Sequence, residues 1–146
     1  MRIIRKRFFS WSEEIRDKLS TFVLSPTSGM TKQLQSGENL LTYVAFINDE
    51  PVGWATVDNG KDKVFYEPRY IYVYVAPDFR ERGIGKALIQ RAIKNRTIPT
   101  TVFAHNWSSF SFYYKILDDI KDKVKIRSYS KNYEKVFEEK FPGISC

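Results

Sequence analysis

The sequence Arg80 Glu81 Arg82 Gly83 Ile84 Gly85 Lys86 Ala87 Leu88 follows the apolar residues 70–75, with four residues between them. Two glycines two residues apart let the backbone approach a ligand closely and expose amide N–H groups. A helix that begins at these glycines adds the positive end of its dipole. The stretch therefore predicts a strand, a tight turn and a helix start that together bind a phosphate or pyrophosphate.

The spacing of the glycines separates three classes of phosphate-binding turn. A dinucleotide-binding fingerprint needs a third glycine where Leu88 stands, and a P-loop needs four residues between its glycines, then Gly-Lys-Ser/Thr. Neither pattern is met. The residues match Gln/Arg-x-x-Gly-x-Gly/Ala as Arg80-x-x-Gly83-x-Gly85. The chain therefore resembles the GNAT superfamily of acetyl-coenzyme A (acetyl-CoA) dependent N-acetyltransferases.

Both flanks of the turn strengthen this resemblance, which covers residues from about 40 to 117. Upstream, Val75-Ala76-Pro77 matches the family's Val-x-Pro strand end, and downstream the helix pattern is amphipathic. Asn106, Ser109 and Tyr113 stand at the spacing of the family's Asn-x-x-Ala-x-x-x-Tyr motif.

The resemblance implies a mixed α/β fold, in which six to seven strands form a central sheet flanked by about four helices. Two central parallel strands splay apart in a V-shaped gap. A length of 146 residues fits one N-acetyltransferase domain, residues 1–146. The patterns predict strands at 2–8, 40–47, 52–57, 64–75, 100–104, 124–129 and 133–137, a helix capped by Ser10 and Glu13, and helices at 83–96 and 108–116.

The resemblance also implies where acetyl-CoA binds. Its pantetheine arm pairs with the backbone of Val73 and Val75 as an added strand would, and the pyrophosphate lies against the glycine turn. The expected cofactor-binding residues are Val73, Tyr74, Val75, Arg80, Glu81, Arg82, Gly83, Ile84, Gly85, Lys86 and Asn106. No metal is expected, because the single cysteine is Cys146.

The net charge of +7 has a local origin. Residues 80–96 carry six basic side chains and one acid, and residues 1–7 add four basic side chains and no acid. A basic turn and helix suit the phosphates of coenzyme A. We therefore favour a match to the cofactor over nucleic-acid binding.

Acetyl transfer to an amine needs stabilisation of the developing oxyanion and a proton for the departing thiolate. Tyr113 matches the family's general acid, and Tyr114 takes its place if the helix register shifts by one residue. Glu67, just before the central strand, is the first candidate for the general base, and His105 is the second. An acceptor amine with a pKa of ~8 needs no base at all.

The C-terminal third departs from the family. Where many members have a Gly-Phe pair after the tyrosine, this chain has Leu117-Asp118-Asp119, which favours a different turn or a longer helix. The acceptor amine, on a small molecule or a protein, is therefore not identified.

Two functions remain open at this point. The first is an acetyltransferase that is cytoplasmic, does not bind membranes, and is a monomer or homodimer. The second is a GNAT-fold module that binds nucleic acid or an acidic protein through its basic N-terminal arm. The second requires outward-facing aromatic side chains near that arm, for which Phe8, Phe9 and Trp11 are the candidates.

Overall fold

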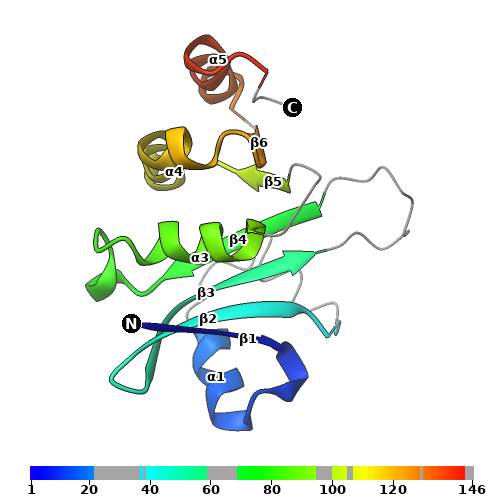
Figure 1. The fold of residues 1–146 in the computed structure, drawn as a ribbon, viewed down its shortest axis with the longest axis vertical. Helices are drawn as coiled ribbons and strands as arrows, with labels where there is room; N and C mark the ends of the chain where they lie inside the picture. Colours follow the sequence, from blue (N-terminus) through cyan, green and yellow to red (C-terminus); the bar gives the residue numbers. More distant parts are fainter. Residues whose placement is uncertain are drawn as a thin grey trace. The chain divides into compact units, whose positions relative to one another are not determined.

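A six-stranded mixed sheet organises the protein, as the computed structural model shows (Figure 1). The structure describes residues 1–21, 37, 39–58, 69–94, 100–104, 107–128 and 130–143. The strands are β1 (Arg2–Arg7), β2 (Leu41–Ile47), β3 (Glu50–Asp58), β4 (Arg69–Val75), β5 (Thr100–Phe103) and β6 (Val124–Arg127), hydrogen-bonded in that order. The described α-helices are α1 (Glu13–Thr21), α3 (Ile84–Ile93), α4 (Trp107–Ile120) and α5 (Lys131–Lys140), with short 3-10 turns η1 (Phe8–Ser10) and η2 (Pro77–Phe79). The mixed α/β fold predicted from the sequence is confirmed.

Strand direction changes along the sheet. β1, β2 and β3 pair antiparallel, whereas β4, β5 and β6 pair parallel. The described residues form two compact units, with unit 1 drawn from 1–58 and 72–94, and unit 2 from 59–71 and 95–146. The single domain and the V-shaped splay stay predictions.

Unit 1 contains the β2–β3 hairpin. Its two turn residues, Asn48 and Asp49, have φ of 51° and 64°, a left-handed conformation that asparagine and aspartate tolerate better than most residues. This turn has the twist that suits two antiparallel strands. The strands predicted at 40–47 and 52–57 are confirmed, and they form the two arms of this hairpin.

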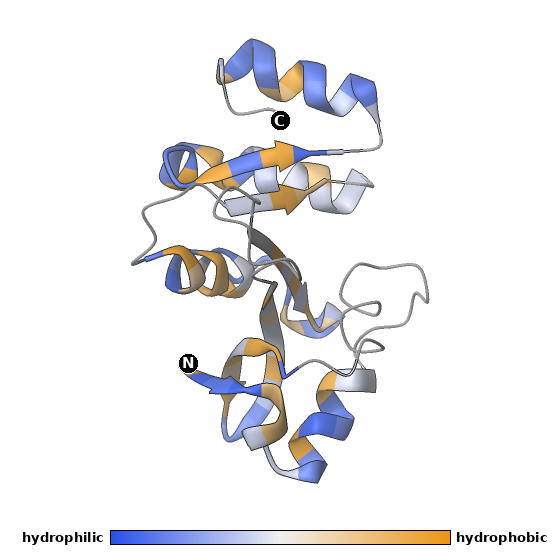
Figure 2. Cartoon of the chain, turned by 90° about the vertical axis from the view of Figure 1, so that its right-hand side faces the viewer, coloured by the Kyte–Doolittle hydropathy of each residue, from blue (hydrophilic) through white to orange (hydrophobic). Residues whose placement is uncertain are grey.

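Both faces of β2 are covered. On one face, Val44 and Phe46 of β2 and Trp54 of β3 form a core cluster with Trp11 and with Leu19 of α1. Helix α3 contacts β2 and β3 and buries its apolar side, which includes Leu88 and Ile89. Figure 2 shows hydrophobic and hydrophilic residues alternating around α1 and α3, as expected for helices that cover a sheet.

Helix α1 begins two residues later than a Ser10 cap would place it. Ser10 belongs to the 3-10 turn, which is closed by the Trp11 N–H donating to the Phe8 carbonyl at 3.2 Å. Ser12 caps the helix instead, since its Oγ accepts from the Ile15 N–H at 3.3 Å. The prediction of a Ser10 and Glu13 capping box was wrong.

Unit 2 holds a parallel ladder. Residues Arg69–Ile71 of β4 pair with Thr100–Val102 of β5, and β5 pairs with β6. Helix α4 extends to Ile120, so the segment without the family's Gly-Phe pair forms a longer helix, one of the two expected alternatives.

The predicted strand at 133–137 was wrong, because these residues lie in helix α5. Ser130 caps this helix through its side chain, which accepts from the Tyr133 N–H. Tyr133 stacks on Phe110 of α4 at 4.7 Å between ring centroids, and Phe137, four residues later, packs against the same ring in a tilted arrangement at 5.1 Å. Tyr133 and Phe137 thus have the spacing of one helix face, whereas the aromatic content of this segment favours a strand when it is considered alone.

Candidate functional site

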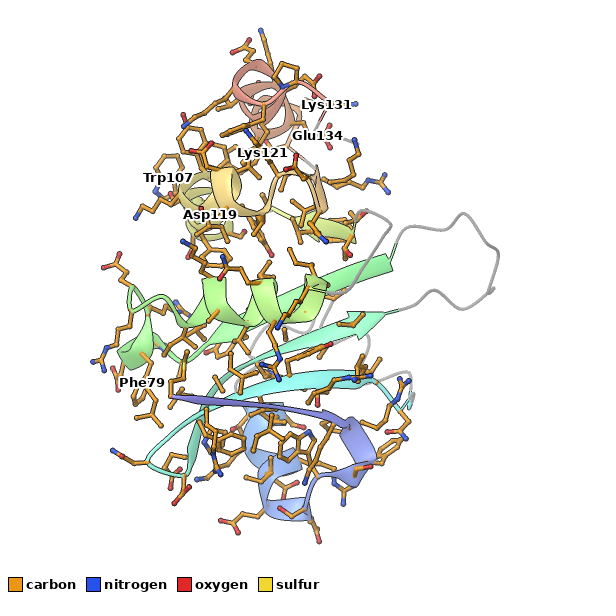
Figure 3. The ribbon with its side chains drawn as sticks, viewed as in Figure 1. Phe79, Trp107, Asp119, Lys121, Lys131 and Glu134 are labelled. Carbon is orange, nitrogen blue, oxygen red and sulfur yellow. The ribbon has the colours of Figure 1, made fainter. Side chains whose placement is uncertain are left out.

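The connection from β4 to α3 is a compact turn within unit 1. After Val75, the 3-10 turn η2 is closed by the Phe79 N–H donating to the Ala76 carbonyl at 2.9 Å. The Arg80 N–H donates to the Pro77 carbonyl at 3.3 Å. Phe79 lies in this connection (Figure 3), and the Arg82 guanidinium stacks 5.2 Å from its ring. Proline at the first position of η2 sets the φ that the turn needs.

Two residues of the turn are left-handed. Glu81 has φ 64° and Gly83 has φ 80°. For a glutamate this conformation costs about 1 kcal/mol, and such strain concentrates at functional sites. A Cβ added at Gly83 would meet no atom within 4 Å, so the positive φ of this residue, and not a steric clash, favours glycine here.

The N-terminus of α3 has the features of an anion site. Its N-cap residue, Gly83, makes no side-chain capping bond, and no acidic residue lies in the first turn. The first backbone bond of the helix joins the Ala87 N–H to the Gly83 carbonyl at 3.0 Å. The N–H groups of Ile84 and Gly85 therefore have no acceptor inside the helix, and the dipole places positive charge there. A bound anion would accept hydrogen bonds from these N–H groups and would be attracted by the positive end of the dipole.

Basic side chains surround this N-terminus. Arg80 and Arg82 are exposed, and Lys86 of the first helical turn is half-buried. The Arg80 Nε donates to the Val75 carbonyl at 2.9 Å, and its guanidinium lies 5.5 Å from the Tyr74 ring centroid. Arg80 thus ties the turn back to the end of β4.

The three predicted β4 residues, Val73, Tyr74 and Val75, are half-buried at the end of that strand. The Ala76 N–H donates to the Val52 carbonyl of β3 at 2.8 Å, which continues the contact between the strands. The structure therefore brings the predicted strand residues and the predicted turn, Arg80 to Lys86, together in unit 1.

Tyr113 and Tyr114 differ in their surroundings within unit 2. Tyr113 is 3% exposed on the inner side of α4, and its ring meets Phe112 edge-on at 4.9 Å. Tyr114 is half-buried, stacks on Phe110 at 5.7 Å and lies 4.1 Å from the Lys140 Nζ. The Tyr114 ring has a packing role, whereas Tyr113 stays the candidate general acid.

Three candidates lie outside the described residues. They are Glu67, His105 and Asn106. Their roles stay predictions.

Binding of nucleic acid or an acidic protein by the N-terminal arm requires outward-facing aromatic side chains, and one of the three candidates meets this requirement. Phe8 and Trp11 belong to the core, 9% and 6% exposed, while Phe9 is 50% exposed. Basic residues of the arm also have local partners: Arg2 pairs with Asp49 at 3.1 Å, and the Lys6 Nζ lies 4.7 Å from the Trp11 ring. The N-terminal arm is thus mainly a sheet edge.

Sequence reasoning missed Gly53 of β3. A Cβ at this position would lie 2.9 Å from the Tyr74 carbonyl oxygen and 3.3 Å from the Val75 Cα. A glycine inside a strand signals a close approach of another backbone, and that signal was present between Val52 and Trp54. Gly53 therefore permits the contact between β3 and the end of β4.

Similarity to known proteins identifies the family of the chain. Residues 5–117 match the family described as "Acetyltransferase (GNAT) family", and the chain belongs to this family of acetyltransferases. No curated protein matches it.

Solved structures show the same fold. The protein smu.2055 from Streptococcus mutans UA159 superposes with a TM-score of 0.56 at 21% identity, over 82% of each chain. The aminoglycoside 6′-N-acetyltransferase AAC(6′)-IG from Acinetobacter haemolyticus superposes with a TM-score of 0.51 at 16% identity, over 90% of this chain and 98% of its own. Among the residues that the structure describes, no helix is long and apolar enough to cross a membrane.

Proposed function

We propose that this protein is an N-acetyltransferase that transfers the acetyl group of acetyl-CoA to a primary amine by direct attack in a ternary complex. The observation that carries the proposal is the N-terminus of α3. It has no side-chain cap, no acid in its first turn, and a strained left-handed turn before it. The pyrophosphate of acetyl-CoA supplies the anion that such a helix start binds.

The residues around the turn supply the remaining charge. Arg82, Arg91 of α3 and Lys94, which directly follows α3, are exposed, so a dianionic or trianionic ligand gains attraction over a wide area. The attraction between exposed charges falls with salt, because the Debye length is ~8 Å at physiological ionic strength. We therefore assign affinity mainly to the helix start, and speed of association to the surrounding cations.

Bound acetyl-CoA supplies an activated thioester carbonyl. The chain must then stabilise the oxyanion that develops when a neutral amine attacks, and we assign this to backbone N–H groups of Val73 to Val75. Tyr113 donates the proton that the departing thiolate needs, a contribution of about 10²–10⁴-fold in rate. Asn106 contacts the pantetheine arm. These roles follow from the family motif, and the burial of Tyr113 suits a proton donor shielded from water.

Three routes for removing the amine proton remain open. Glu67 is our first candidate, His105 the second, and solvent the third if the acceptor amine is neutral at the working pH. A pH profile of kcat/KM distinguishes them, because a carboxylate and a histidine titrate at different pH. The acceptor is a primary amine of a small molecule or a protein, and we propose that the enzyme acts in the cytoplasm.

The binding half of the proposal is tested by isothermal titration with acetyl-CoA. We expect wild type to bind with a Kd below about 100 µM, inside the usual range for enzyme substrates. Gly83→Glu places a bulky anion in the open space at the helix start, and we expect it to weaken binding at least tenfold.

Gly143→Glu is the matched control for this substitution. Gly143 also has positive φ, 87°, and open space around its Cα, but it lies after α5. It therefore carries the same backbone strain away from the turn, and its Kd should equal that of wild type. Absence of binding by wild type at high micromolar acetyl-CoA refutes the proposed function.

A further inference from the structure

The end of β4 has a hydrogen bond that the family motif does not predict. The Arg80 Nε donates to the Val75 carbonyl oxygen at 2.9 Å, and the guanidinium lies 5.5 Å from the Tyr74 ring. The Val75 carbonyl, at the end of the strand, thus accepts its hydrogen bond from a side chain and not from the backbone of a neighbouring strand.

Strand geometry identifies the backbone groups that this contact leaves available. The polar groups of successive residues point alternately to the two edges of a strand. The Ala76 N–H donates to Val52 of β3, and the Tyr74 carbonyl approaches Gly53 of β3, so the even-numbered residues face β3. Val73 and Val75 therefore direct their N–H and C=O groups to the other edge, where Arg80 occupies the Val75 carbonyl.

We propose that Arg80 is a positioning residue that sets the register of the pantetheine arm on β4, an inference that rests on the proposed function. With the Val75 carbonyl occupied, the edge offers the Val73 N–H, the Val73 carbonyl and the Val75 N–H. This is a donor, acceptor, donor pattern that ends at Val75. A ligand arm with secondary amides pairs with it through an acceptor, a donor and an acceptor. If the arm were shifted along β4 toward the turn, its next N–H donor would meet the Val75 carbonyl, which Arg80 already occupies.

This role differs from attraction of phosphate by charge, and side-chain chemistry separates the two. In glutamine the Nε2 atom stands the same number of bonds from the backbone as the arginine Nε, so Arg80→Gln keeps the donor and removes the charge. Lysine keeps the charge but carries a methylene at that position, with its ammonium one bond further out. Arg80→Lys therefore keeps the charge and removes the positioned donor.

The experiment compares two ligands with three proteins. The ligands are coenzyme A and 3′-phospho-ADP, which is its nucleotide half without the pantetheine arm. The proteins are wild type, Arg80→Gln and Arg80→Lys, with folding checked by urea unfolding. The ratio of the two Kd values measures what the arm adds to binding.

We expect Arg80→Gln to keep this ratio within about threefold of wild type and Arg80→Lys to reduce it about tenfold, a difference of one decade in affinity. Amide hydrogen exchange gives a second readout, since coenzyme A should protect the Val75 N–H in wild type and Arg80→Gln but not in Arg80→Lys.

Two results overturn the inference while leaving the proposed function intact. In the first, Arg80→Lys keeps the ratio and Arg80→Gln loses affinity for both ligands, which assigns Arg80 to phosphate attraction. In the second, neither variant changes the ratio. If wild type binds neither coenzyme A nor acetyl-CoA, the proposed function itself fails.

Discussion

Gly53 of β3 lies so close to Tyr74 of β4 that an added Cβ would stand 2.9 Å from the Tyr74 carbonyl oxygen. The second neighbour, the Val75 Cα at 3.3 Å, is also backbone, which cannot rotate away. The close approach of these strands therefore depends on the absence of a side chain at position 53.

We predict that Gly53→Ala destabilises the protein by about 1–3 kcal/mol, as overpacking does in other cores. Urea unfolding measures the loss. Because the displaced atoms belong to the strand end that we assign to the cofactor, the Kd for acetyl-CoA should also rise. A neutral or stabilising substitution, as expected from reduced entropy of the unfolded chain alone, would show that β4 relaxes freely.

A buried hydroxyl links β2 to the N-terminal segment. Thr42 Oγ1 accepts from the Trp11 Nε1–H at 2.8 Å and donates to the Lys6 carbonyl at 2.7 Å, and Thr42 is fully buried. We predict that Thr42→Val, which keeps the shape but removes the acceptor of the buried Trp11 Nε1–H, costs about 2 kcal/mol in the free energy of unfolding. Thr42→Ser keeps the hydroxyl and should cost about 1 kcal/mol or less. Equal losses in the two variants, measured by urea unfolding, would assign the effect to packing.

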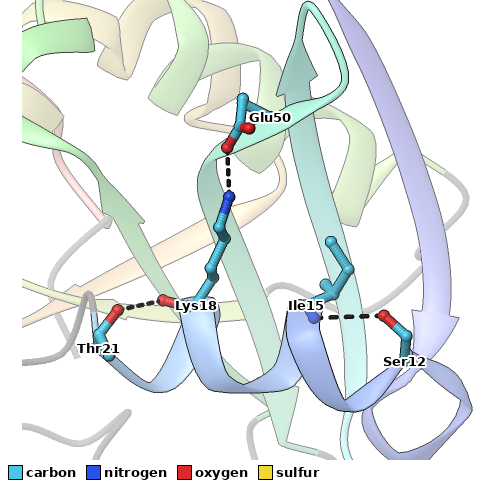
Figure 4. A network of polar contacts seen from close by, with 5 residues as sticks. All are labelled: Ser12, Ile15, Lys18, Thr21 and Glu50. Atoms are coloured by element: carbon cyan, nitrogen blue, oxygen red, sulfur yellow. Dashed lines mark hydrogen bonds and ion pairs between the residues drawn. The ribbon is translucent and has the colours of Figure 1, made fainter.

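The ion pair between Lys18 of α1 and Glu50, at the start of β3, fastens the helix to the hairpin (Figure 4). The hydrogen bond to Glu50 raises the pKa of Lys18 above its ordinary 10.5, with the Coulombic attraction of Glu50 adding to it. A raised pKa means that the stabilisation is fully present below pH 10.5 and is lost as pH rises through the folded-state value.

We therefore predict that the difference in Tm between wild type and Lys18→Met is small, because the pair is exposed, and that it disappears as the pH rises above the raised pKa of Lys18 and also in 1 M salt. Lys135→Met, which removes an exposed lysine from α5, serves as the control. A difference between wild type and Lys18→Met that persists at high pH would indicate that the lysine stem, not its charge, contributes.

Local chemistry explains which parts of the fold could be predicted. The turn from Arg80 to Leu88 was predictable because glycine spacing and helical periodicity act over a few neighbouring residues. The nature of residues 133–137 was not, because aromatic composition favours a strand while the cap at Ser130 and the stacking on Phe110 of α4 favour a helix. The stacking on Phe110 is a tertiary contact, which local sequence patterns do not indicate.

The same distinction applies to the candidate site. Arg80 was predicted from the motif, but its bond to the Val75 carbonyl depends on how the chain turns between residues 76 and 79. Gly53 lies on a different strand from the motif, so only its isolated position in a strand pattern could have drawn attention to it. Residues that touch the motif across the sheet are therefore visible only in the folded chain.

Tyr113 and Tyr114 stand side by side in sequence on α4 and give a matched pair of substitutions. The Tyr114 ring contributes through Phe110, Phe137 and the Lys140 ammonium, which Tyr114→Phe keeps. If Tyr113 is the general acid, Tyr113→Phe lowers the rate of acetyl transfer about 10²-fold or more, while Tyr114→Phe stays near wild type.

Thiol release from acetyl-CoA, measured against a panel of primary amines, gives the rates. The Kd of both variants for acetyl-CoA should stay near wild type, which separates a chemical role from binding. Tyr113→Phe should lose more rate with rising leaving-group basicity of the thiol, because a more basic thiolate depends more on protonation. Equal rates for the two variants would remove Tyr113 from the catalytic residues and leave the thiolate to be protonated by solvent.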